Sequence, residues 1–570
     1  GKEGELWGGH RSRSAVLLGG GCVCRAKRAK KAKKAKKEQA CEGALVPTLA
    51  GAWSSPKRTG RGLAVGVMGR DYYSRAVVAW GFFVGLLGML GVVPEVSCFE
   101  VARVVPAEQF GREISLEDFG AVEGDASANV TNRRALNRAL VHARPGDTVV
   151  VPPGTWYLTG GIVSQRERSH LTLDLRGNLS FVFDLENWPQ NPDTGRYANC
   201  FDFSRIQHFT MTGTSVEGRG GLPQVAIDGN GKGWWDGVMT NKISSGGRPR
   251  MLSISNSSDV LVQNLLLVNS PSWHLRIAAA RAEVRFVHIE VDRQVQAEIK
   301  THMAQRSPKL PSEFGSLLPG KDSLILQPED LNTDGIDTAG VDIWVHDCVV
   351  HNDDDSVAVK PTNVGQTFID GTTADCTERV VVEDTVLTGF GASIGSVGAS
   401  TKRSCVDSAT FRNIAMPNTG KGIYIKSNKA TCDEGQYSRI SNILYENINI
   451  YRPRWWAIWI GPQQQHEPHT ELGGDCAIAY PIAKHCPTQG CTDFSNITLR
   501  NVLIEDPLLS PGVLLGNESN RMNVTFENVV ARMSDGGELP TFPFDGYKVD
   551  HVNGKCLGVC DPFPEKFTAE

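Results

Sequence analysis

The stretch that decides the fold is "VDIWVHDCVV" (Val341–Val350), in which two short apolar alternations meet at one polar residue, Asp347. Alternation with a period of two predicts β-strands, and the β-branched residues favour them. Aspartate tolerates the left-handed backbone that a sharp bend between two strands requires. The pattern therefore predicts a strand, a bend and a second strand.

The same unit recurs from about residue 250 to about residue 531. Its polar hinge residue falls at eight positions: Asn264, His288, Asp347, Asp384, Asn413, Asn447, Asn501 and Asn528. No helix-period segment separates the copies, which argues against a doubly wound sheet, and a β-sandwich with irregular spacing remains the alternative. Repeated units without obvious hairpin turns favour an all-β solenoid of stacked coils.

Two other segments complete this organisation. The segment "NVTNRRALNRALVHA" (residues 129–143) is the one clear amphipathic helix, and we expect it to cap one end of the solenoid. Residues 293–321 interrupt the repeats with a polar, unpatterned stretch, which we interpret as an inserted surface loop. The solenoid domain is expected to span residues 99–560.

The charge of the chain is unevenly distributed. Of the net charge of −4, residues 1–75 contribute 17 Lys/Arg against 5 Asp/Glu, or +12, which leaves about −16 for the rest. Nine of these positive charges lie between Arg25 and Lys37. Such a run is usually a disordered, solvated tail, and the acidic body disfavours nucleic-acid binding. We therefore interpret residues 1–67 as a disordered basic extension.

An apolar segment follows. Residues 76–93 are 18 uncharged residues, on the border between a signal-peptide core and a membrane anchor. If translation starts at Met68, residues 68–98 form a signal peptide and residues 1–67 are not part of the natural product. Otherwise residues 76–93 anchor the protein to a membrane. Both interpretations export everything after about residue 98.

Cysteine usage agrees with an oxidising compartment. Eleven of the 14 cysteines lie at or beyond Cys98 and none forms a CxxC metal pattern. The candidates for loop disulfides, with connectivity left open, are Cys476, Cys486, Cys491, Cys556 and Cys560. Six N-x-S/T sequons fit export and a glycoprotein: Asn129, Asn178, Asn256, Asn496, Asn517 and Asn523.

The chemistry is expected in an aspartate cluster. Seven aspartates lie between Asp334 and Asp355, and Asp334 precedes Asp354 and Asp355 by 20 and 21 residues. Because a solenoid coil takes about 20 residues or more, these carboxylates should lie on neighbouring rungs of one face. Like charges so close cannot all ionise, so one carboxyl should keep its proton near neutral pH. Such a group supplies the acid and base of glycosidic hydrolysis; a calcium site and solvated turns are the alternatives.

An ordered set of motifs gives this cluster a context. "NTDGID" at Asn332, "DDSVAVK" at Asp354, "GFGASIGSVG" at Gly389 and "GIYIKS" at Gly422 follow one another, and the agreement extends over roughly residues 115–535. The chain resembles glycoside hydrolase family 28, the polygalacturonases and their relatives. The resemblance implies a right-handed parallel β-helix that cleaves pectic polysaccharides with inversion.

The resemblance also implies roles for particular residues. Asp334 and Asp355 would be the general bases that hold the water, and Asp354 would be the general acid. Asn332 would orient Asp334, and Lys426 would bind a substrate carboxylate. For an inverting enzyme we expect about 6.5–9.5 Å between the acid and the bases. We expect no metal and no cofactor.

Two positions depart from the family's motifs. Phe390 stands where the family usually has a histidine that assists the acid, and Tyr424 stands where it usually has an arginine that grips a uronate. A phenol cannot replace a bidentate guanidinium without losing charge recognition. Both positions are expected to contact substrate, and strict polygalacturonate specificity is in doubt.

We therefore predict a secreted or membrane-anchored monomer that hydrolyses a pectin-like polysaccharide, either galacturonan or rhamnogalacturonan. One alternative is a β-helix polysaccharide lyase, which needs calcium and a strongly basic residue. The other is a carbohydrate-binding β-helix whose catalysis has lapsed. Phe390 favours this last possibility, and the intact set of three aspartates opposes it.

Overall fold

The computed structural model describes residues 101, 103–106 and 110–570, except 165–166, 215–222, 305–330, 399–402, 429–437, 465–475, 477–485, 487–490 and 519–520. The predicted basic extension (1–67) and the signal or anchor segment (68–98) lie outside these residues. Among the described helices, none has the length and apolar character needed to cross a bilayer.

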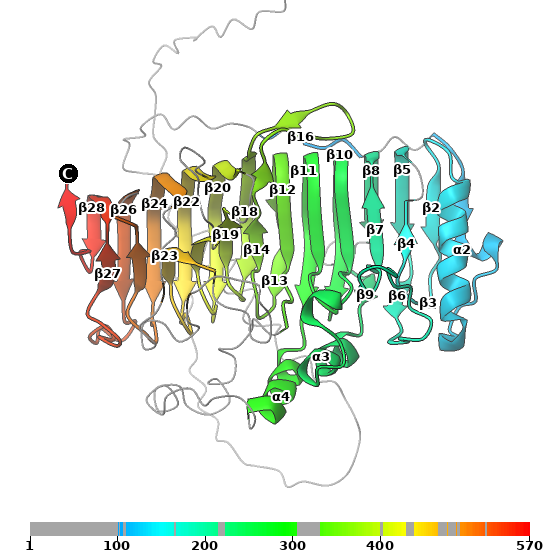
Figure 1. The fold of residues 1–570 in the computed structure, drawn as a ribbon, viewed down its shortest axis with the longest axis horizontal. Helices are drawn as coiled ribbons and strands as arrows, with labels where there is room; N and C mark the ends of the chain where they lie inside the picture. The colour runs from blue at the N-terminus through cyan, green and yellow to red at the C-terminus, as the bar shows by residue number, and fades with distance from the viewer. Residues whose placement is uncertain are drawn as a thin grey trace, which may run out of the picture. The chain divides into compact units, whose positions relative to one another are not determined.

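The described strands form a right-handed parallel β-helix, in which successive coils stack side by side along the long axis of Figure 1. Each coil contributes to up to three parallel ladders, which we name faces A, B and C. Face A consists of β4 (Ile162–Val163), β7 (Phe201–Ser204), the first parts of β10 (Leu252–Val268), β11 (Leu275–Glu290) and β12 (Ile336–His346), then β14 (Val357–Val359), β19 (Ala392–Val397), β21 (Ile423–Ser427), β23 (Ile458–Gln463), β25 (Gly512–Leu515) and β27 (Tyr547–Asp550).

The other two faces continue the same coils. Face B consists of β1 (Glu113–Ser115), β2 (Thr148–Val151), β5 (Arg168–Leu175), β8 (Ile206–Gly213), the following parts of β10, β11 and β12, then β18 (Thr377–Leu387), β20 (Ser404–Pro417), β22 (Ser438–Tyr451), β24 (Thr492–Glu505), β26 (Met522–Arg532), β28 (Val552–Asp561) and β29 (Phe567–Ala569). Face C consists of β3 (Thr155–Leu158), β6 (Asn178–Phe181), β9 (Ala226–Asp228), β13 (Val349–His351) and the last parts of β10, β11, β18, β20, β22, β24 and β26.

Short elements complete the description. β15 (Thr362–Asn363) pairs antiparallel with β20, and β16 (Gln366–Thr367) pairs antiparallel with β17 (Thr373–Ala374). The helices are η1 (Leu116–Phe119), η2 (Ala126–Ala128), α2 (Asn129–His142), α3 (Gly231–Met239), η3 (Ser245–Gly247) and α4 (Arg293–Ala304). The prediction of an all-β solenoid is confirmed.

The bend between faces B and C lies at the predicted hinge residues. Their backbone is left-handed at seven of the eight predicted positions: Asn264, Asp347, Asp384, Asn413, Asn447, Asn501 and Asn528. The prediction is wrong at His288, because the left-handed residue of that coil is Phe286, with φ 51°. His288 instead pairs with Val349 in the ladder of face C. The register of the neighbouring coil, rather than the residue type, decides where this bend falls.

Asparagine is favoured at the hinge for a second reason. The Asn528 amide donates to Asn501 at 3.2 Å, Asn501 donates to Asn447 at 3.1 Å, and Asn447 donates to Asn413 at 3.1 Å. Each coil thus satisfies the side-chain acceptor of the coil before it. The left-handed bend and the amide ladder together explain the recurring asparagine.

A second left-handed bend, between faces A and B, was not predicted. Its residues are His170, His208, Asp259, Arg281, Asp342, Arg379, Ser408, Asn442 and Asn496. Arginine at such a bend gives no turn signal in sequence, yet the structure pairs it across coils. Arg281 Nε lies 2.6 Å from Asp259 and Arg379 Nε lies 2.6 Å from Asp342. Ion pairs between coils hold a conformation that the side chains themselves do not favour.

The N-terminal end of the core is closed by α2, as predicted. Leu136 and Leu140 are buried in the same core as the strands, and Figure 1 shows α2 at the end of the stack. The Asn132 amide donates to the carbonyl oxygens of Val122 and Tyr157, at 2.9 and 3.0 Å. An open sheet edge has unpaired backbone groups, so this helix covers an apolar end and satisfies polar groups beside it.

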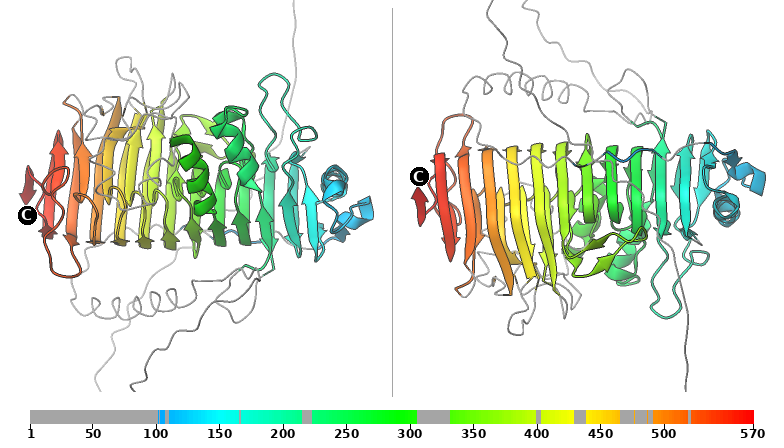
Figure 2. Two further views of the ribbon diagram at one scale, coloured as in Figure 1. Left: turned by 90° about the horizontal axis from the view of Figure 1, so that it is seen from below. Right: turned by 90° about the horizontal axis from the view of Figure 1, so that it is seen from above.

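The predicted inserted loop at 293–321 is wrong for its first part, because residues Arg293–Ala304 form α4. Val295 and Ile299 are spaced by four and pack against Trp235 and Met239 of α3. Figure 2 shows the two helices side by side. One apolar pair is too weak a signal to predict a helix in a polar segment. Residues 305–321 lie outside the described residues.

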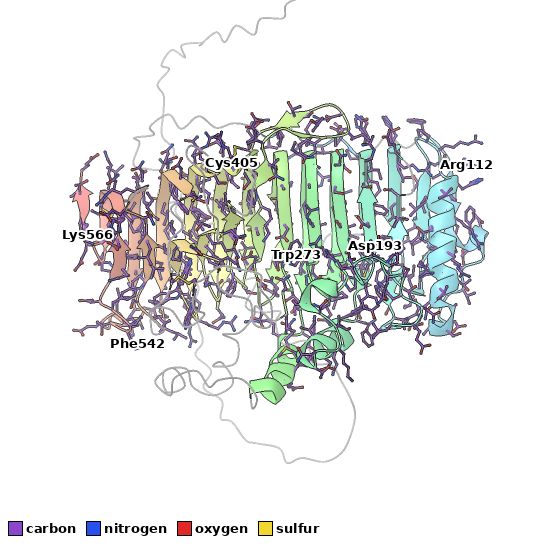
Figure 3. All side chains as sticks on the ribbon, in the orientation of Figure 1. Arg112, Asp193, Trp273, Cys405, Phe542 and Lys566 are labelled. Carbon is purple, nitrogen blue, oxygen red and sulfur yellow. A yellow bond between two sulfur atoms is a disulfide. The ribbon has the colours of Figure 1, made fainter. Side chains whose placement is uncertain are left out.

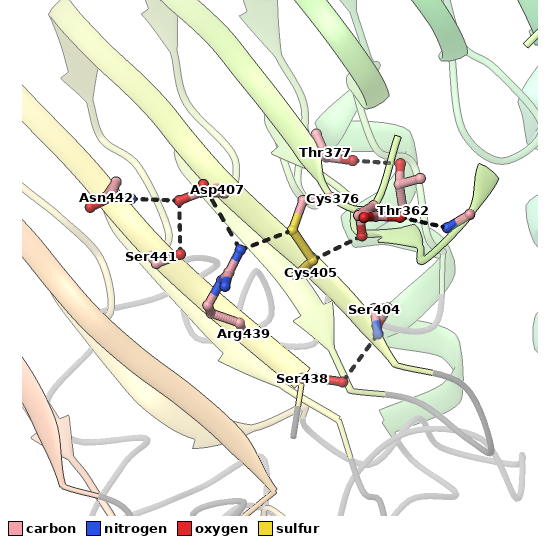
Figure 4. The surroundings of a disulfide bond; sticks show 12 residues. Thr362, Cys376, Thr377, Ser404, Cys405, Asp407, Ser438, Arg439, Ser441 and Asn442 are labelled. Carbon is pink, nitrogen blue, oxygen red and sulfur yellow. Dashed lines mark hydrogen bonds and ion pairs between the residues drawn. A yellow bond between two sulfur atoms is a disulfide. The ribbon is translucent and has the colours of Figure 1, made fainter. Parts of the chain in front are cut away.

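Three disulfides join pairs of described cysteines. Cys476–Cys486 and Cys556–Cys560 join predicted candidates, and Cys491 is also disulfide-bonded. The third, Cys376–Cys405, was not predicted (Figure 4). It joins the segment before β18 to β20, two neighbouring coils, which the sequence separation of 29 does not reveal.

Candidate active site

Face A brings the predicted site residues together. In parallel strands of fixed register, equivalent residues of successive coils stand side by side. In the ladder of face A, the first paired residues of β11, β12, β14, β19 and β21 stand side by side. The residues two positions before them form a row next to this ladder: Trp273, Asp334, Asp355, Phe390 and Lys421. Asp334 and Asp355, which are 21 residues apart in the sequence, thus lie side by side on neighbouring coils.

The three carboxylates lie closer than predicted. One oxygen each of Asp334, Asp354 and Asp355 lies within 4.8 Å of the other two, below the separation of about 6.5–9.5 Å expected for an inverting pair. Adjacent strands are only about 4.7–4.9 Å apart, and Asp354 directly precedes Asp355. The spacing of the coils therefore sets how closely these oxygens approach, and the separation of the carboxyl groups in the active complex stays a prediction.

Burial limits how many carboxyl groups of this cluster are ionised. Burial raises the pKa of Asp334 well above its ordinary value, and the charges of Asp354 and Asp337 raise it further. Asp334 therefore favours its protonated form, with Asp354 as its charged neighbour. Asp354 is the most exposed of the three predicted catalytic aspartates, at 7%. Its Oδ1 accepts a 2.7 Å hydrogen bond from the Asp355 amide, which fixes the carboxyl in place.

Asp355, in contrast, is held in the ionised state. Burial alone would raise its pKa, but Lys426 and Lys360 hold the pKa at about 2. Lys426 Nζ lies 3.1 and 3.3 Å from its two oxygens, and Lys360 Nζ lies 3.1 Å from Oδ2. The Ser393 hydroxyl donates to Oδ1 at 2.9 Å. Asp355 is thus an ionised carboxylate whose oxygens are both engaged.

Sequence reasoning missed two members of the site, Lys360 and Asp337. Lys360 Nζ lies 3.4 Å from Asp334 Oδ2, 3.3 Å from Asp337 Oδ1 and 3.1 Å from Asp355 Oδ2. Burial raises the pKa of Asp337 as well. The signal was the period of two, since Val357 and Val359 face the core and Lys360 therefore faces outward, as Asp337 does after the core residue Ile336.

A buried histidine also positions Asp334. His274 lies fully buried, its Nδ1 is 3.0 Å from the Asp334 carbonyl oxygen, and its Nε2 accepts a 3.2 Å hydrogen bond from the Ser270 amide. Burial lowers the pKa of His274 to about 4. The ring is therefore neutral and donates from Nδ1. No signal in the sequence distinguishes this histidine from a surface one.

We expect His274 to make folding stability depend on pH. Between pH 6.5 and 4 the unfolded chain binds a proton that the folded chain does not, so stability falls as the pH is lowered through this window. The contribution at pH 4.5 is about 2–3 kcal/mol. Denaturant unfolding at pH 4.5 and 7 should show a smaller pH difference for His274→Gln than for the parent. His551→Gln, at a partly exposed site, is the control. An unchanged pH difference in the His274 variant would contradict the assignment.

Phe390 and Tyr424 lie in a buried aromatic cluster beside the aspartates. Tyr424 is 1% exposed, and its ring lies edge-on to Phe390 with centroids 5.6 Å apart. Lys421 Nζ lies 4.6 Å from the Phe390 centroid, 4.0 Å from Tyr424 and 4.7 Å from Trp459. These rings stabilise a cation by cation–π interaction. Tyr424 therefore packs beneath the site rather than offering a surface to a ligand.

Basic side chains flank the aspartates on the N-terminal side. The Arg250 guanidinium lies 4.0 Å over the ring of Trp273, which Figure 3 labels. Burial and the nearby charges of Arg276 and Arg196 together lower the pKa of Arg250 to about 10. Three guanidinium groups thus lie near one another beside the carboxylates. Asn332 enters the site in a left-handed conformation, with φ 46°, and turns the chain into Asp334.

The comparisons with known proteins agree with this geometry. The family model of the glycosyl hydrolases family 28 matches residues 147–471. A probable endo-xylogalacturonan hydrolase A of Aspergillus niger is 25% identical over 330 residues, which cover 57% of this chain and 66% of that protein. An exopolygalacturonase of Cochliobolus carbonum is 25% identical over 305 residues, covering 53% and 55%. The chain thus spans just under two thirds of the first relative and about half of the second.

Solved structures share the fold. An exopolygalacturonase from Thermotoga maritima matches with a TM-score of 0.51 and 14% identity, over 82% of this chain and 94% of that one. A polygalacturonase from Erwinia carotovora matches with a TM-score of 0.50 and 17% identity, over 80% and 99%. At such identities the likeness concerns the fold.

Proposed function

The chain belongs to the glycosyl hydrolases family 28, and from that premise we propose that it hydrolyses glycosidic bonds of a galacturonan-type, pectin-like polysaccharide. The observation that carries the proposal is the close set of three aspartates, in which burial and like charge favour the protonated form of Asp334 while two ammonium groups hold Asp355 ionised. A protonated carboxyl beside an ionised one supplies the acid and the base that hydrolysis of a glycosidic bond requires.

The geometry supports a division of roles. Asp354, the most exposed of the three, donates the proton to the leaving oxygen. Asp355, held ionised by Lys360 and Lys426, orients the attacking water with Asp334. Asn332 sets the backbone that delivers Asp334. We propose inversion despite the short spacing, because a carboxylate whose two oxygens bind ammonium groups is a poor nucleophile and a firm acceptor for water.

The surrounding charge supports an anionic substrate. Arg250, Arg276 and Arg196 lie near one another on one side, and Lys426 lies on the other. An ammonium has three N–H donors, so Lys426 binds Asp355 and still reaches a uronate carboxylate. A run of positive charge on both sides of the aspartates matches a polyuronate backbone that crosses successive coils.

Tyr424 and Phe390 modify this recognition. The position of Tyr424 carries no guanidinium, and its ring packs under Lys426, whose Nζ lies 4.3 Å from the ring centroid. The uronate carboxylate is then bound by lysine ammonium groups, which act as point charges, and not by the two parallel hydrogen bonds of an arginine guanidinium. We propose that this relaxes the requirement for an unsubstituted galacturonate and admits a substituted galacturonan. Relatives named endo-xylogalacturonan hydrolase are consistent with this reading.

The lyase alternative fits less well. A lyase needs calcium at the carboxylates and a neutral base. Two ammonium groups already occupy the positions around Asp355 that a cation would take. The aspartates hold the pKa of Lys360 well above its ordinary value, against the effect of burial, so this residue stays charged and is not the base.

We expect chelation to leave activity unchanged. Polygalacturonate, xylogalacturonan and rhamnogalacturonan should each be incubated with the enzyme, with and without excess EDTA. Chromatography should resolve new reducing ends, and absorbance near the ultraviolet band of unsaturated uronides should stay at baseline. Activity that is lost on chelation and restored by calcium, with unsaturated products, would assign a lyase. No cleavage of any polymer would contradict the hydrolase.

We propose that the protein is exported and acts as a monomer outside the cell. The disulfides that join described coils, such as Cys376–Cys405, support an oxidising compartment. The substrate, a polymer of the cell wall, requires the same location.

A further inference from the structure

A group of two histidines and one glutamate lies on face C, outside the aspartate site. His288 and Glu290 are two residues apart on β11, so the period of two places both side chains on the same side of the strand. In the parallel ladder Glu290 pairs with His351 of β13, on the next coil. The three side chains thus gather from two neighbouring coils on the partly exposed side of face C.

Their polar atoms converge. Glu290 Oε2 lies 2.9 Å from His351 Nδ1 and 3.3 Å from His288 Nε2, and one ligand atom from each residue lies within 4.8 Å of the others. The backbone is fixed by the ladder, because the Asn269 amide donates to the Glu290 carbonyl and the Val291 amide donates to the His351 carbonyl. Side chains on strands are positioned more accurately than side chains on loops.

These distances suit a transition-metal ion. Metal–ligand bonds of about 2.0–2.2 Å in a tetrahedral site place neighbouring ligand atoms about 3.3 Å apart. The distance from Glu290 Oε2 to His288 Nε2 is 3.3 Å and already has this length, and the distance to His351 Nδ1 is shorter, at 2.9 Å. All three ligand atoms lie within 4.8 Å of one another.

The free ring nitrogen of His288 also suits a metal. His288 Nε2 is buried and lies too far out of line to hydrogen-bond this carboxylate. Its lone pair is therefore available once the proton resides on Nδ1.

We propose that His288, Glu290 and His351 form a binding site for a divalent transition-metal ion, with zinc as the reference ion. Imidazole nitrogens select zinc, copper or nickel over calcium, which prefers six to eight oxygen ligands. The Glu290 side chain is half exposed, so water completes the coordination. The site joins β11 to β13 and thereby stabilises two coils. This proposal does not depend on the hydrolase activity.

The test is zinc binding to the full chain, purified and stripped with a chelator. Titration calorimetry with zinc chloride should show one strong site, and zinc should raise the unfolding temperature. His351→Gln and Glu290→Gln should each weaken this binding by about tenfold or more, since each removes a ligand. His551→Gln, which removes a partly exposed histidine paired with Asp550, should bind as the parent does. Calcium should not bind at this site.

Two outcomes would overturn the proposal. One is parental zinc affinity in both ligand variants. The other is loss of binding only on substitution of His208, whose ring lies 4.4 Å from that of His170 and forms the other described histidine pair near a carboxylate. If either ligand variant does not fold, anomalous scattering at the zinc edge from crystals of the parent soaked in zinc decides the question. A peak between His288 and His351 supports the site, and a peak only elsewhere rejects it.

Discussion

Replacing Asp354 by asparagine is expected to lower kcat by about two to four orders of magnitude, because asparagine keeps the shape of the side chain but cannot donate the proton. KM should change little, because the proton is needed mainly in the transition state. The substitution should preserve the fold, since the asparagine oxygen still accepts the 2.7 Å hydrogen bond from the Asp355 amide. The loss of activity therefore reports on proton donation.

The measurement is the initial rate of reducing-end release by the parent and the variant at equal concentration, with unfolding curves to verify the fold. Asp347→Asn is a matched control in the same span of sequence. Asp347 is half exposed, and its left-handed backbone accepts asparagine as readily as aspartate. Its activity should equal that of the parent.

The same preparation tests the remaining alternatives. Near-normal turnover by Asp354→Asn would remove this residue from the role of acid, and a parent protein that binds the polymer without cleaving it would be a lapsed enzyme. The anomeric configuration of the first product, followed by NMR, should be inverted. Retained configuration would instead require one of the close carboxylates to act as a nucleophile, as a separation of about 5–5.5 Å allows in other glycosidases.

Replacing Lys360 by methionine is expected to destabilise the protein by about 3–5 kcal/mol, the cost of removing one partner from a buried ion cluster. Lys360 Nζ lies within 3.4 Å of three carboxylates whose side chains are nearly inaccessible, Asp334, Asp337 and Asp355. Methionine fills the space of the lysine stem but leaves this charge without its central cation. Denaturant unfolding at pH 7 measures the loss.

The pH dependence distinguishes electrostatics from packing. Without Lys360 the folded-state pKa values of Asp334 and Asp337, already raised by burial, rise further, and Asp355 loses one of the two cations that lower its pKa. The folded variant therefore binds more protons than the folded parent and regains stability as the pH falls. The deficit should therefore shrink between pH 7 and pH 4. Lys232→Met is the control, because Lys232 and Asp236 form an exposed pair whose loss should change stability by less than about 1 kcal/mol. A deficit for Lys360→Met below about 1 kcal/mol, or one that is independent of pH, would contradict this role.

Much of the architecture follows from the sequence by itself. The alternating apolar residues of "VDIWVHDCVV" specify strands, and the asparagine or aspartate at the centre specifies a bend, because both signals are local properties of backbone and side chain. Counting 20 and 21 residues from Asp334 to Asp354 and Asp355 then predicts the aspartate cluster, since the length of a coil converts sequence distance into lateral contact. The capping helix is likewise encoded in its own period.

The tertiary structure decided the rest, because those features depend on register between coils. Phe286 rather than His288 forms the bend of its coil, and Arg281 and Arg379 accept left-handed backbones, because cross-coil partners fix them there. The spacing between strands, not the needs of a mechanism, sets the distance between the aspartates. Lys360 becomes the central cation, and Glu290 meets His351, only when neighbouring coils align. Local sequence specifies each coil, whereas the contacts between coils arise from residues far apart in the chain, and those contacts set the charge states of the site.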